Sequence, residues 1–296
     1  MAHIHGSGRN GRPAERTPGR SREHAAKNRK GAGARRRTLS QNFLTDPSVA
    51  RRMVRAADLP DDALVLEPGA GDGMITSLLA RGDRRVTAFE VDPHFARRLS
   101  ERFAAAPRVR VRTADFTAAP APREPFSVVG NIPYSRTSAI VDWCLRARAL
   151  RSATLLTQWE YARKRTGASG RWSRLTVLTW PQFEWTLGER VHRGRFHPVP
   201  RVDSGVLRIV RRPEPLLPAA ALADYRALVE AGFSGVGGSL DASLRRLHRA
   251  RRVDAALRAA GVERGTVVAF VTPRQWVALS CHLLGIEGDR IAGEAR

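Results

Sequence analysis

Short apolar runs alternate with helical patterns between residues 39 and 212, and this alternation most constrains how the chain can fold. The expected strands are Leu64–Leu66, Arg85–Phe89, Val109–Arg112, Phe126–Val129, Ala153–Thr157, Phe183–Leu187 and Val206–Val210. Apolar residues recur at helical spacing in the intervening stretches Pro47–Ala57, Met74–Arg81, Pro93–Phe103 and Ser138–Arg148. The pattern predicts an α/β fold with a doubly wound, Rossmann-like sheet that binds ligands at the carboxyl ends of its strands.

The pattern changes after Arg211-Arg212-Pro213-Glu214-Pro215, which we interpret as a linker because proline interrupts both helices and strands. Helical periodicity dominates beyond it, over Leu222–Phe233, Leu240–Arg252, Val253–Ala260 and Pro273–Leu284. We therefore expect an α/β domain at residues 39–212, a small helical domain with a basic surface at 213–290, and a short tail at 291–296.

The balance of charge points to a polyanionic partner. The 296 residues include 51 Lys and Arg against 28 Asp and Glu, a net charge of +23, which favours nucleic acid or an anionic membrane surface. Residues 1–38 hold 11 of the basic residues and two acidic ones, with Ile4 as the one branched aliphatic residue. Such a segment cannot bury enough apolar surface to order itself, so we expect a disordered arm that binds nucleic acid or merely aids solubility.

Composition also limits the environment of the protein. No apolar run approaches the roughly 18 residues of a membrane span, so we expect no membrane partner. Cys144 and Cys281 lie far apart, and neither they nor the histidines show metal-ligand spacing. A protein of the reducing cytoplasm without a metal site is the expectation.

A glycine-rich loop joins the first expected strand to a helix, in Glu67-Pro68-Gly69-Ala70-Gly71-Asp72-Gly73. Gly69 and Gly71 allow a tight turn and let a ligand approach the backbone at a helix start. The spacing is GxGxG rather than the GxGxxG of dinucleotide sites. Glu67 would repel a pyrophosphate but could organise a cationic amino-acid group. A purely structural turn is the alternative.

Acidic residues follow the next two expected strands. Glu90 could accept both hydroxyls of a ribose, although an acid on the surface that caps the following helix is possible, a role better suited to Asp92. Asp115 could accept the amino group of a cofactor adenine, or it could simply make a loop turn with its own backbone.

The fourth expected strand leads into Asn131-Ile132-Pro133-Tyr134. The amide of Asn131 and the carbonyl of Ile132, which precedes a proline, offer two acceptors, and Tyr134 offers an aromatic face. These groups suit holding the exocyclic amine of a base, and a turn with a buried tyrosine is the alternative. Together the four strand ends describe an S-adenosylmethionine pocket beside an amine-holding site.

The ordered series resembles the ribosomal RNA adenine N6-methyltransferase family over residues 39–211. The sequence Leu39-Ser40-Gln41-Asn42-Phe43-Leu44 is similar to the family's N-terminal loop, which folds over the methionine end of the cofactor. The resemblance implies that Gln41, Asn42 and Leu44 join Gly69, Gly71, Glu90, Asp115 and Asn131 in binding that cofactor. It also implies catalytic roles for Asn131, Ile132 and Tyr134.

A later stretch, Phe196-His197-Pro198-Val199-Pro200-Arg201-Val202-Asp203-Ser204, resembles the motif whose aromatic residue supports the target adenine. Phe196 and Tyr134 would then clamp an extruded base from its two faces. Ordinary core packing of Phe196 is the alternative. Ser40 resembles the Erm macrolide-resistance branch, whereas the branch that dimethylates adjacent small-subunit adenines more often has Gly there.

The resemblance implies a methyltransferase domain at residues 39–212 and an RNA-binding helical domain at 213–290. The implied reaction transfers a methyl group to N6 of one adenine of 23S rRNA, before full ribosome assembly, and confers macrolide, lincosamide and streptogramin B resistance. We expect a monomer in the cytoplasm. Three alternatives stay open: a 16S rRNA adenine dimethylase, a nucleic-acid-binding protein of the same fold without catalysis, and a nicotinamide dehydrogenase.

Overall fold

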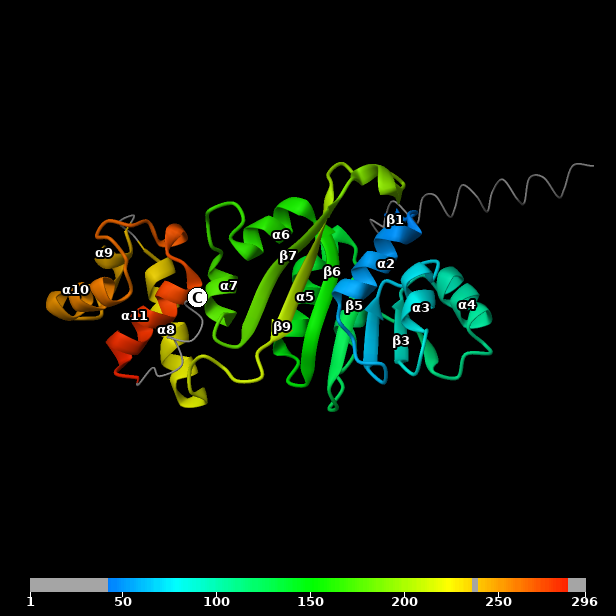
Figure 1. Ribbon diagram of the computed structural model, residues 1–296, viewed down its shortest axis with the longest axis horizontal. Coiled ribbons are helices and arrows are strands. Elements are labelled where there is room, and N and C mark those ends of the chain that lie inside the picture. Colours follow the sequence, from blue (N-terminus) through cyan, green and yellow to red (C-terminus); the bar gives the residue numbers. More distant parts are fainter. Residues whose placement is uncertain (1–41, 236–238, 287–296) are drawn as a thin grey trace, which may run out of the picture. The chain divides into compact units, whose positions relative to one another are not determined.

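The computed structural model describes residues 42–235 and 239–286 (Figure 1). The predictions for the arm at 1–38, for Gln41 and for the tail at 291–296 therefore lie outside the described residues. These described residues belong to one compact unit.

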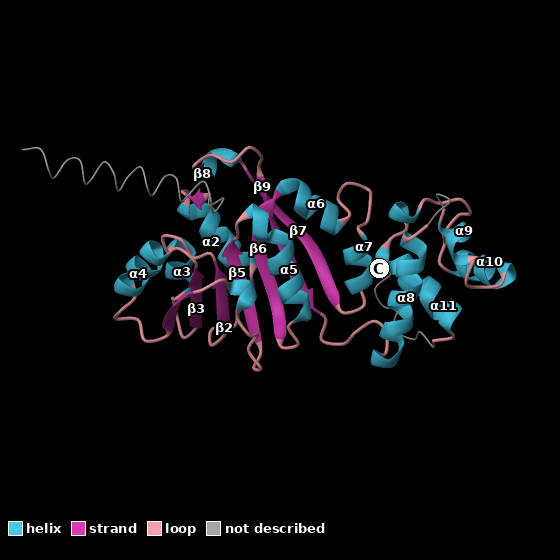
Figure 2. Cartoon of the chain, turned by 180° about the vertical axis from the view of Figure 1, so that it is seen from behind, coloured by secondary structure: helices cyan, strands magenta, loops and turns pink. Residues whose placement is uncertain are grey.

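Seven strands form one sheet with helices on both faces, as Figure 2 shows. The predicted doubly wound arrangement is confirmed for five parallel strands, to which two antiparallel strands are added at one side. The order across the sheet is β4 (Val109–Thr113), β3 (Arg85–Glu90), β2 (Leu64–Pro68), β5 (Phe126–Asn131), β6 (Leu150–Gln158), β9 (Ser204–Arg211) and β7 (Phe183–Val191).

Alternate residues of each strand point to opposite faces and so enter two different cores. Val65 and Val129 pack with helices α2 (Pro47–Ala56) and α3 (Met74–Leu79) on one face. Helix α4 (Pro93–Arg102) lies on that same face, where Leu99 contacts Ala88 of β3. Leu66 and Val128 belong to the other core, with α5 (Thr137–Arg146).

Two further helices, α6 (Trp159–Thr166) and α7 (Arg174–Thr179), link β6 to β7. The basic run Arg163-Lys164-Arg165 lies in α6. Strands β1 (Phe43–Leu44) and β8 (Phe196–His197) form a separate antiparallel pair that periodicity did not predict. Single 3₁₀ turns lie at η1 (Phe116–Ala118), η2 (Tyr134–Arg136), η3 (Arg193–Arg195), η4 (Ala219–Ala221) and η5 (Val268–Phe270).

The C-terminal part is helical, as expected, with α8 (Leu222–Phe233), α9 (Leu240–Leu244), α10 (Ala250–Ala259) and α11 (Pro273–Leu284). The predicted continuous helix Leu240–Arg252 was wrong, because α9 ends at Leu244 and α10 begins at Ala250. Arg245 instead forms an ion pair with Asp254 of α10 at 2.7 Å, which fixes the turn between the two helices.

The helices of the C-terminal part share a continuous apolar core with the sheet. The buried hydroxyl of Tyr225 in α8 donates to the carbonyl oxygen of Val177 in α7 at 2.8 Å. Arg174 of α7 pairs with Glu230 of α8 at 2.8 Å. Residues on both sides of the predicted linker are therefore packed against each other.

Gly130 allows β5 to pass close to the end of β2, immediately before Asn131. A Cβ atom at Gly130 would lie 2.9 Å from the Pro68 carbonyl oxygen and 3.0 Å from the Pro68 Cδ. The substitution Gly130→Ala should therefore lower the free energy of unfolding by roughly 1–3 kcal/mol through overpacking. Thermal unfolding of the two proteins checks this, and an unchanged melting temperature would contradict the close approach.

Candidate active site

Parallel pairing brings the carboxyl ends of β2, β3, β4 and β5 to one edge of the sheet. The register places Glu67 opposite Ala88 and Glu90 opposite Thr113, so the loops after these strands are neighbours. The structure therefore brings together the glycine loop, Glu90, Asp115 and Asn131, which lie far apart in the sequence.

The glycine loop needs glycine for its backbone conformation. Gly69 and Gly71 have φ values of +69° and +57°, in the left-handed region that residues with a Cβ atom rarely adopt. A Cβ atom at Gly71 would also lie 2.9 Å from Cε1 of Phe43. Phe43 therefore covers this loop, next to Asn42 and Leu44 of the predicted cofactor segment.

Glu90 is 1% exposed, so the alternative of an acid on the surface was wrong. Its two carboxylate oxygens accept hydrogen bonds from the backbone amides of Gly71 and Asp92, each at 2.9 Å. A carboxylate has about four acceptor positions, and binding of ribose hydroxyls by Glu90 stays a prediction. The Asp92 carboxylate caps α4 by accepting from the His94 amide at 2.8 Å, as expected.

Asp115 makes a turn with the backbone of its own loop, as the alternative prediction for this residue had it. One of its oxygens accepts from the amide and the hydroxyl of Thr117, both at 2.8 Å, and the other pairs with Arg136. Although partial burial opposes ionisation, the hydrogen bonds from Thr117 and the charge of Arg136 hold the pKa of Asp115 below its usual range. Binding of a cofactor adenine by Asp115 stays a prediction.

Glu67 is buried directly before the glycine loop. The hydroxyl of Thr76 donates to its Oε2 at 2.6 Å. Burial raises the pKa of Glu67 to about 8, against the opposing effect of the Thr76 hydrogen bond. A cationic group nearby would stabilise the ionised form of this carboxyl.

The side-chain amide of Asn131 has a defined orientation. Its Nδ2 donates to the backbone carbonyl of Asn42 at 2.8 Å, and a carbonyl can only accept, so Oδ1 must point the other way. Among the residues that the structure describes, none donates to Asn131 Oδ1 or to the carbonyl oxygen of Ile132. The predicted pair of acceptors is therefore available.

Tyr134 follows these acceptors and is held by a hydrogen bond between its hydroxyl and that of the buried Ser204, at 2.7 Å. Burial raises the pKa of Tyr134, so the phenol stays neutral near pH 7. The bond fixes the direction of the ring, and sequence reasoning did not identify Ser204, although it lies in the quoted late motif.

Phe196 is 2% exposed and packs with Leu44, Val191 and Val206 in the core on the α2 side of the sheet. The β1–β8 pairing places Phe196 opposite Leu44. Core packing, its alternative assignment, therefore describes the structure. Contact between Phe196 and a base stays a prediction.

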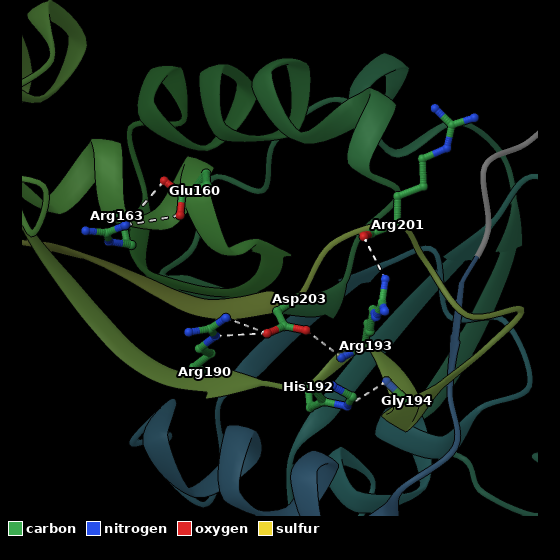
Figure 3. Close-up of polar contacts among 8 residues, drawn as sticks. All are labelled: Glu160, Arg163, Arg190, His192, Arg193, Gly194, Arg201 and Asp203. Atoms are coloured by element: carbon green, nitrogen blue, oxygen red, sulfur yellow. Dashed lines mark hydrogen bonds and ion pairs between the residues drawn. The ribbon is translucent and has the colours of Figure 1, made fainter.

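Asp203, the residue before Ser204, contacts Arg190 and Arg193, as Figure 3 shows. Its carboxylate accepts from the backbone amide of Arg193 and from the guanidinium of Arg190, both at 2.9 Å. Its backbone carbonyl accepts from the amide of Trp159, also at 2.9 Å. The Arg193 amide, together with Arg190, lowers the pKa of Asp203 despite partial desolvation. One acidic residue thus joins the ends of β7, β9 and β6.

Within residues 42–235 and 239–286, no three His, Cys, Asp or Glu side chains are grouped closely enough to hold a metal ion. No helix in the same ranges combines the length and the apolar character that a membrane crossing needs.

The residues at the sheet edge fit S-adenosylmethionine. The glycine backbone at Gly69 and Gly71 permits close approach, Glu90 has acceptors for a ribose, and Glu67 has a carboxyl for an ammonium group. The doubly wound sheet and this site define an S-adenosylmethionine-dependent methyltransferase.

Known proteins resemble the chain over most of its length. The family model of the ribosomal RNA adenine dimethylases matches residues 33–283. An rRNA adenine N-6-methyltransferase of Streptomyces fradiae is 59% identical over 246 residues, which cover 82% of this chain and 77% of that protein. The mycinamicin-resistance protein MyrB of Micromonospora griseorubida is 39% identical over 244 residues, 82% of this chain and 78% of MyrB.

A crystal structure of the 23S rRNA methyltransferase ErmE superimposes with a TM-score of 0.79 at 52% sequence identity. The match covers 82% of this chain and 99% of the ErmE chain. The chain therefore belongs to the ribosomal RNA adenine dimethylase family, and it is an S-adenosylmethionine-dependent rRNA adenine N6-methyltransferase.

The raised pKa of Glu67 has a consequence for stability. Between pH 4.5 and 8 the folded state holds a proton that the unfolded state releases, so the free energy of unfolding falls as pH rises through this window. Glu67→Gln removes this contribution. Melting temperatures from pH 5 to 9 should show the wild type losing stability relative to Glu67→Gln up to about pH 8, and two parallel curves would contradict the assignment.

The contacts of Asp203 predict a positioning role. Asp203→Asn removes a negative charge from a basic surface, which by charge alone should strengthen RNA binding. Because it also weakens the Arg190 and Arg193 contacts next to Ser204, we expect methyl transfer to slow about 10-fold under saturating RNA, with no loss of RNA affinity. Single-turnover rates and binding titrations measure the two effects.

Glu189→Gln is the matched control, since Glu189 of β7 also holds an arginine, Arg52, through two contacts of 2.7 Å. The Glu189→Gln variant loses the same single negative charge and leaves the contacts next to Ser204 unchanged. Equal transfer rates for the wild type and Asp203→Asn would rule out the positioning role.

Proposed function

We propose that this enzyme methylates N6 of one adenine of 23S rRNA and thereby confers macrolide, lincosamide and streptogramin B resistance. It acts as a cytoplasmic monomer on RNA that is not yet in a fully assembled ribosome. The orientation of the Asn131 amide, whose Nδ2 donates to the Asn42 carbonyl, is the observation that supports the proposed methyl transfer to an amine. The likeness to ErmE, a 23S rRNA methyltransferase, and to the resistance protein MyrB supports the substrate and the biological role.

The adenine amine is a poor nucleophile, because its lone pair is delocalised into the ring. In the proposed complex, Asn131 Oδ1 and the Ile132 carbonyl oxygen accept its two N–H bonds. Two acceptors at these positions favour a pyramidal nitrogen, whose lone pair is then available. S-adenosylmethionine, when bound, supplies an activated methyl group on its sulfonium.

Holding the amine in line with that methyl group contributes more than acid–base catalysis does. Tyr134 presents its ring to the base, and stacking of this kind contributes roughly 1–3 kcal/mol. Its neutral phenol is bonded to Ser204 and is not placed to act as a base. The proton lost from the methylated amine passes to water.

The cofactor is held by residues of the sheet edge in this proposal. Glu90 binds the ribose hydroxyls, Asp115 the adenine amino group, and Glu67 the ammonium group of the methionine part. Asn42 and Leu44, beside Phe43, border the methionine end. A methyl group on the target nitrogen would remove a hydrogen-bond donor and fill space where the drug packs.

Mapping of the methylated position tests the substrate. Purified protein is incubated with protein-free 23S and 16S rRNA, and the products are mapped by primer-extension stops. A single stop in the peptidyl-transferase region of 23S rRNA is expected. Stops at adjacent adenines near the 16S 3′ end would instead identify the small-subunit dimethylase, the second candidate, which the family as a whole includes.

The substitution Asn131→Ala removes one of the two acceptors and should slow methyl transfer about 10²–10³-fold, the usual cost of one hydrogen bond to a reacting group. The melting temperature serves as the control and should change little. Methyl transfer by Asn131→Ala at the wild-type rate would show that Asn131 does not hold the target amine.

A further inference from the structure

Among the residues that the structure describes, a groove lies on the sheet surface beside β3 and β4. The connection from β4 to β5 spans residues 114–125, all of them described, and contains only the three-residue turn η1. Helices α3 and α4 pack on the opposite face of β2 and β3. The groove is a cavity of about 490 Å³, which we call the sheet groove.

The sheet groove combines an apolar floor with a cationic rim. Leu64, Leu66 and Phe89 line it from β2 and β3, and Pro120 and Pro122 line it from the β4–β5 connection. Four arginines also line the groove: Arg85, Arg108, Arg110 and Arg112. Glu124 is the acidic residue among the lining residues.

Two of these arginines have acidic partners. Arg85 makes two contacts with Glu124, of 2.6 and 3.2 Å, and Arg108 pairs with Asp83 at 3.3 Å. Arg110 and Arg112 are exposed, and within the described ranges no acidic side chain pairs with either of them. The groove therefore keeps two uncompensated positive charges, which favours an anionic occupant.

The register of the sheet relates the groove to the active site. Arg110 lies opposite Thr87 and Arg112 opposite Phe89, and the next pair along the strands is Thr113 with Glu90. Arg112 is thus one residue pair from the buried acid of the cofactor site. Arg110 and Arg112 point to the same side, about 6.6 Å apart along the strand, so the positive charge continues away from the catalytic edge.

We propose that the sheet groove is a second binding site for the rRNA substrate, in which Arg110 and Arg112 bind phosphates of the backbone beyond the target adenine. Guanidinium groups suit phosphate oxygens because they donate in a planar fork. Only the choice of 23S rRNA as the probe rests on the proposed function.

The double variant Arg110→Gln/Arg112→Gln tests the site. Its affinity for a transcript of the peptidyl-transferase domain of 23S rRNA is measured at several salt concentrations. Each lost phosphate contact should reduce the slope of log affinity against log salt by about 0.7–0.9, so the slope should fall by roughly 1.5. Affinity for S-adenosylmethionine should stay within twofold of the wild type.

Arg97→Gln/Arg98→Gln is the matched control, because both arginines are exposed on α4, on the opposite face of the sheet. It removes the same charge and should leave the slope near the wild-type value. An unchanged slope for the groove variant, or the same decrease in both variants, would overturn the proposal.

The outcome is separable from that of the proposed function. A groove-specific change in slope with no methylation of 23S rRNA would reject the proposed substrate and keep the binding site. Methylation of 23S rRNA with equal slopes in all three proteins would keep the proposed substrate and reject the binding site.

Discussion

Parallel pairing of β2, β3, β4 and β5 is the constraint on which the rest of the site depends. It brings four loops to one edge, where the buried Glu90 carboxylate accepts backbone amides from the glycine loop and from the start of α4. The hydrogen bond from Asn131 to the Asn42 carbonyl then ties the N-terminal segment to the end of β5. The glycine loop, the Asn131 amide and Phe43, which packs against Gly71, thus lie together at this edge.

A second set of contacts supports the opposite side of the site. Asp203 joins the ends of β6, β7 and β9, and the adjacent Ser204 holds the hydroxyl of Tyr134. In a chain with a net charge of +23, an acidic side chain on the surface weakens attraction to phosphate. Asp203 and Asp115 are each bonded to an arginine and to a backbone amide, which agrees with a role in geometry.

The sequence predicted the central strands, the site edge and most helices, because each has a local signal. Apolar runs mark the strands, Gly69 and Gly71 mark the loop at the site edge, and a proline after a capping residue marks the start of several helices. It did not predict β1 and β8, whose two-residue strands are defined only by each other. The break after α9 also depends on a distant partner, the Asp254 that binds Arg245. Gly130, Ser204 and Asp203 were missed for the same reason, since their contacts join segments remote in the chain. Phe196 is buried, in agreement with its alternative assignment to the core, and its contact with a target base stays a prediction.

In the proposed complex, Asn131 Oδ1 and the Ile132 carbonyl oxygen hold the target amine while Tyr134 stacks on the base. A crystal structure of the enzyme with S-adenosylhomocysteine and an RNA fragment containing the target adenosine tests this placement. We expect the adenine N6 to lie within hydrogen-bond distance, about 2.7–3.2 Å, of both oxygens, with the Asn131–Asn42 bond intact. A base seated elsewhere, or an Asn131 amide turned to donate to the adenine, would contradict it.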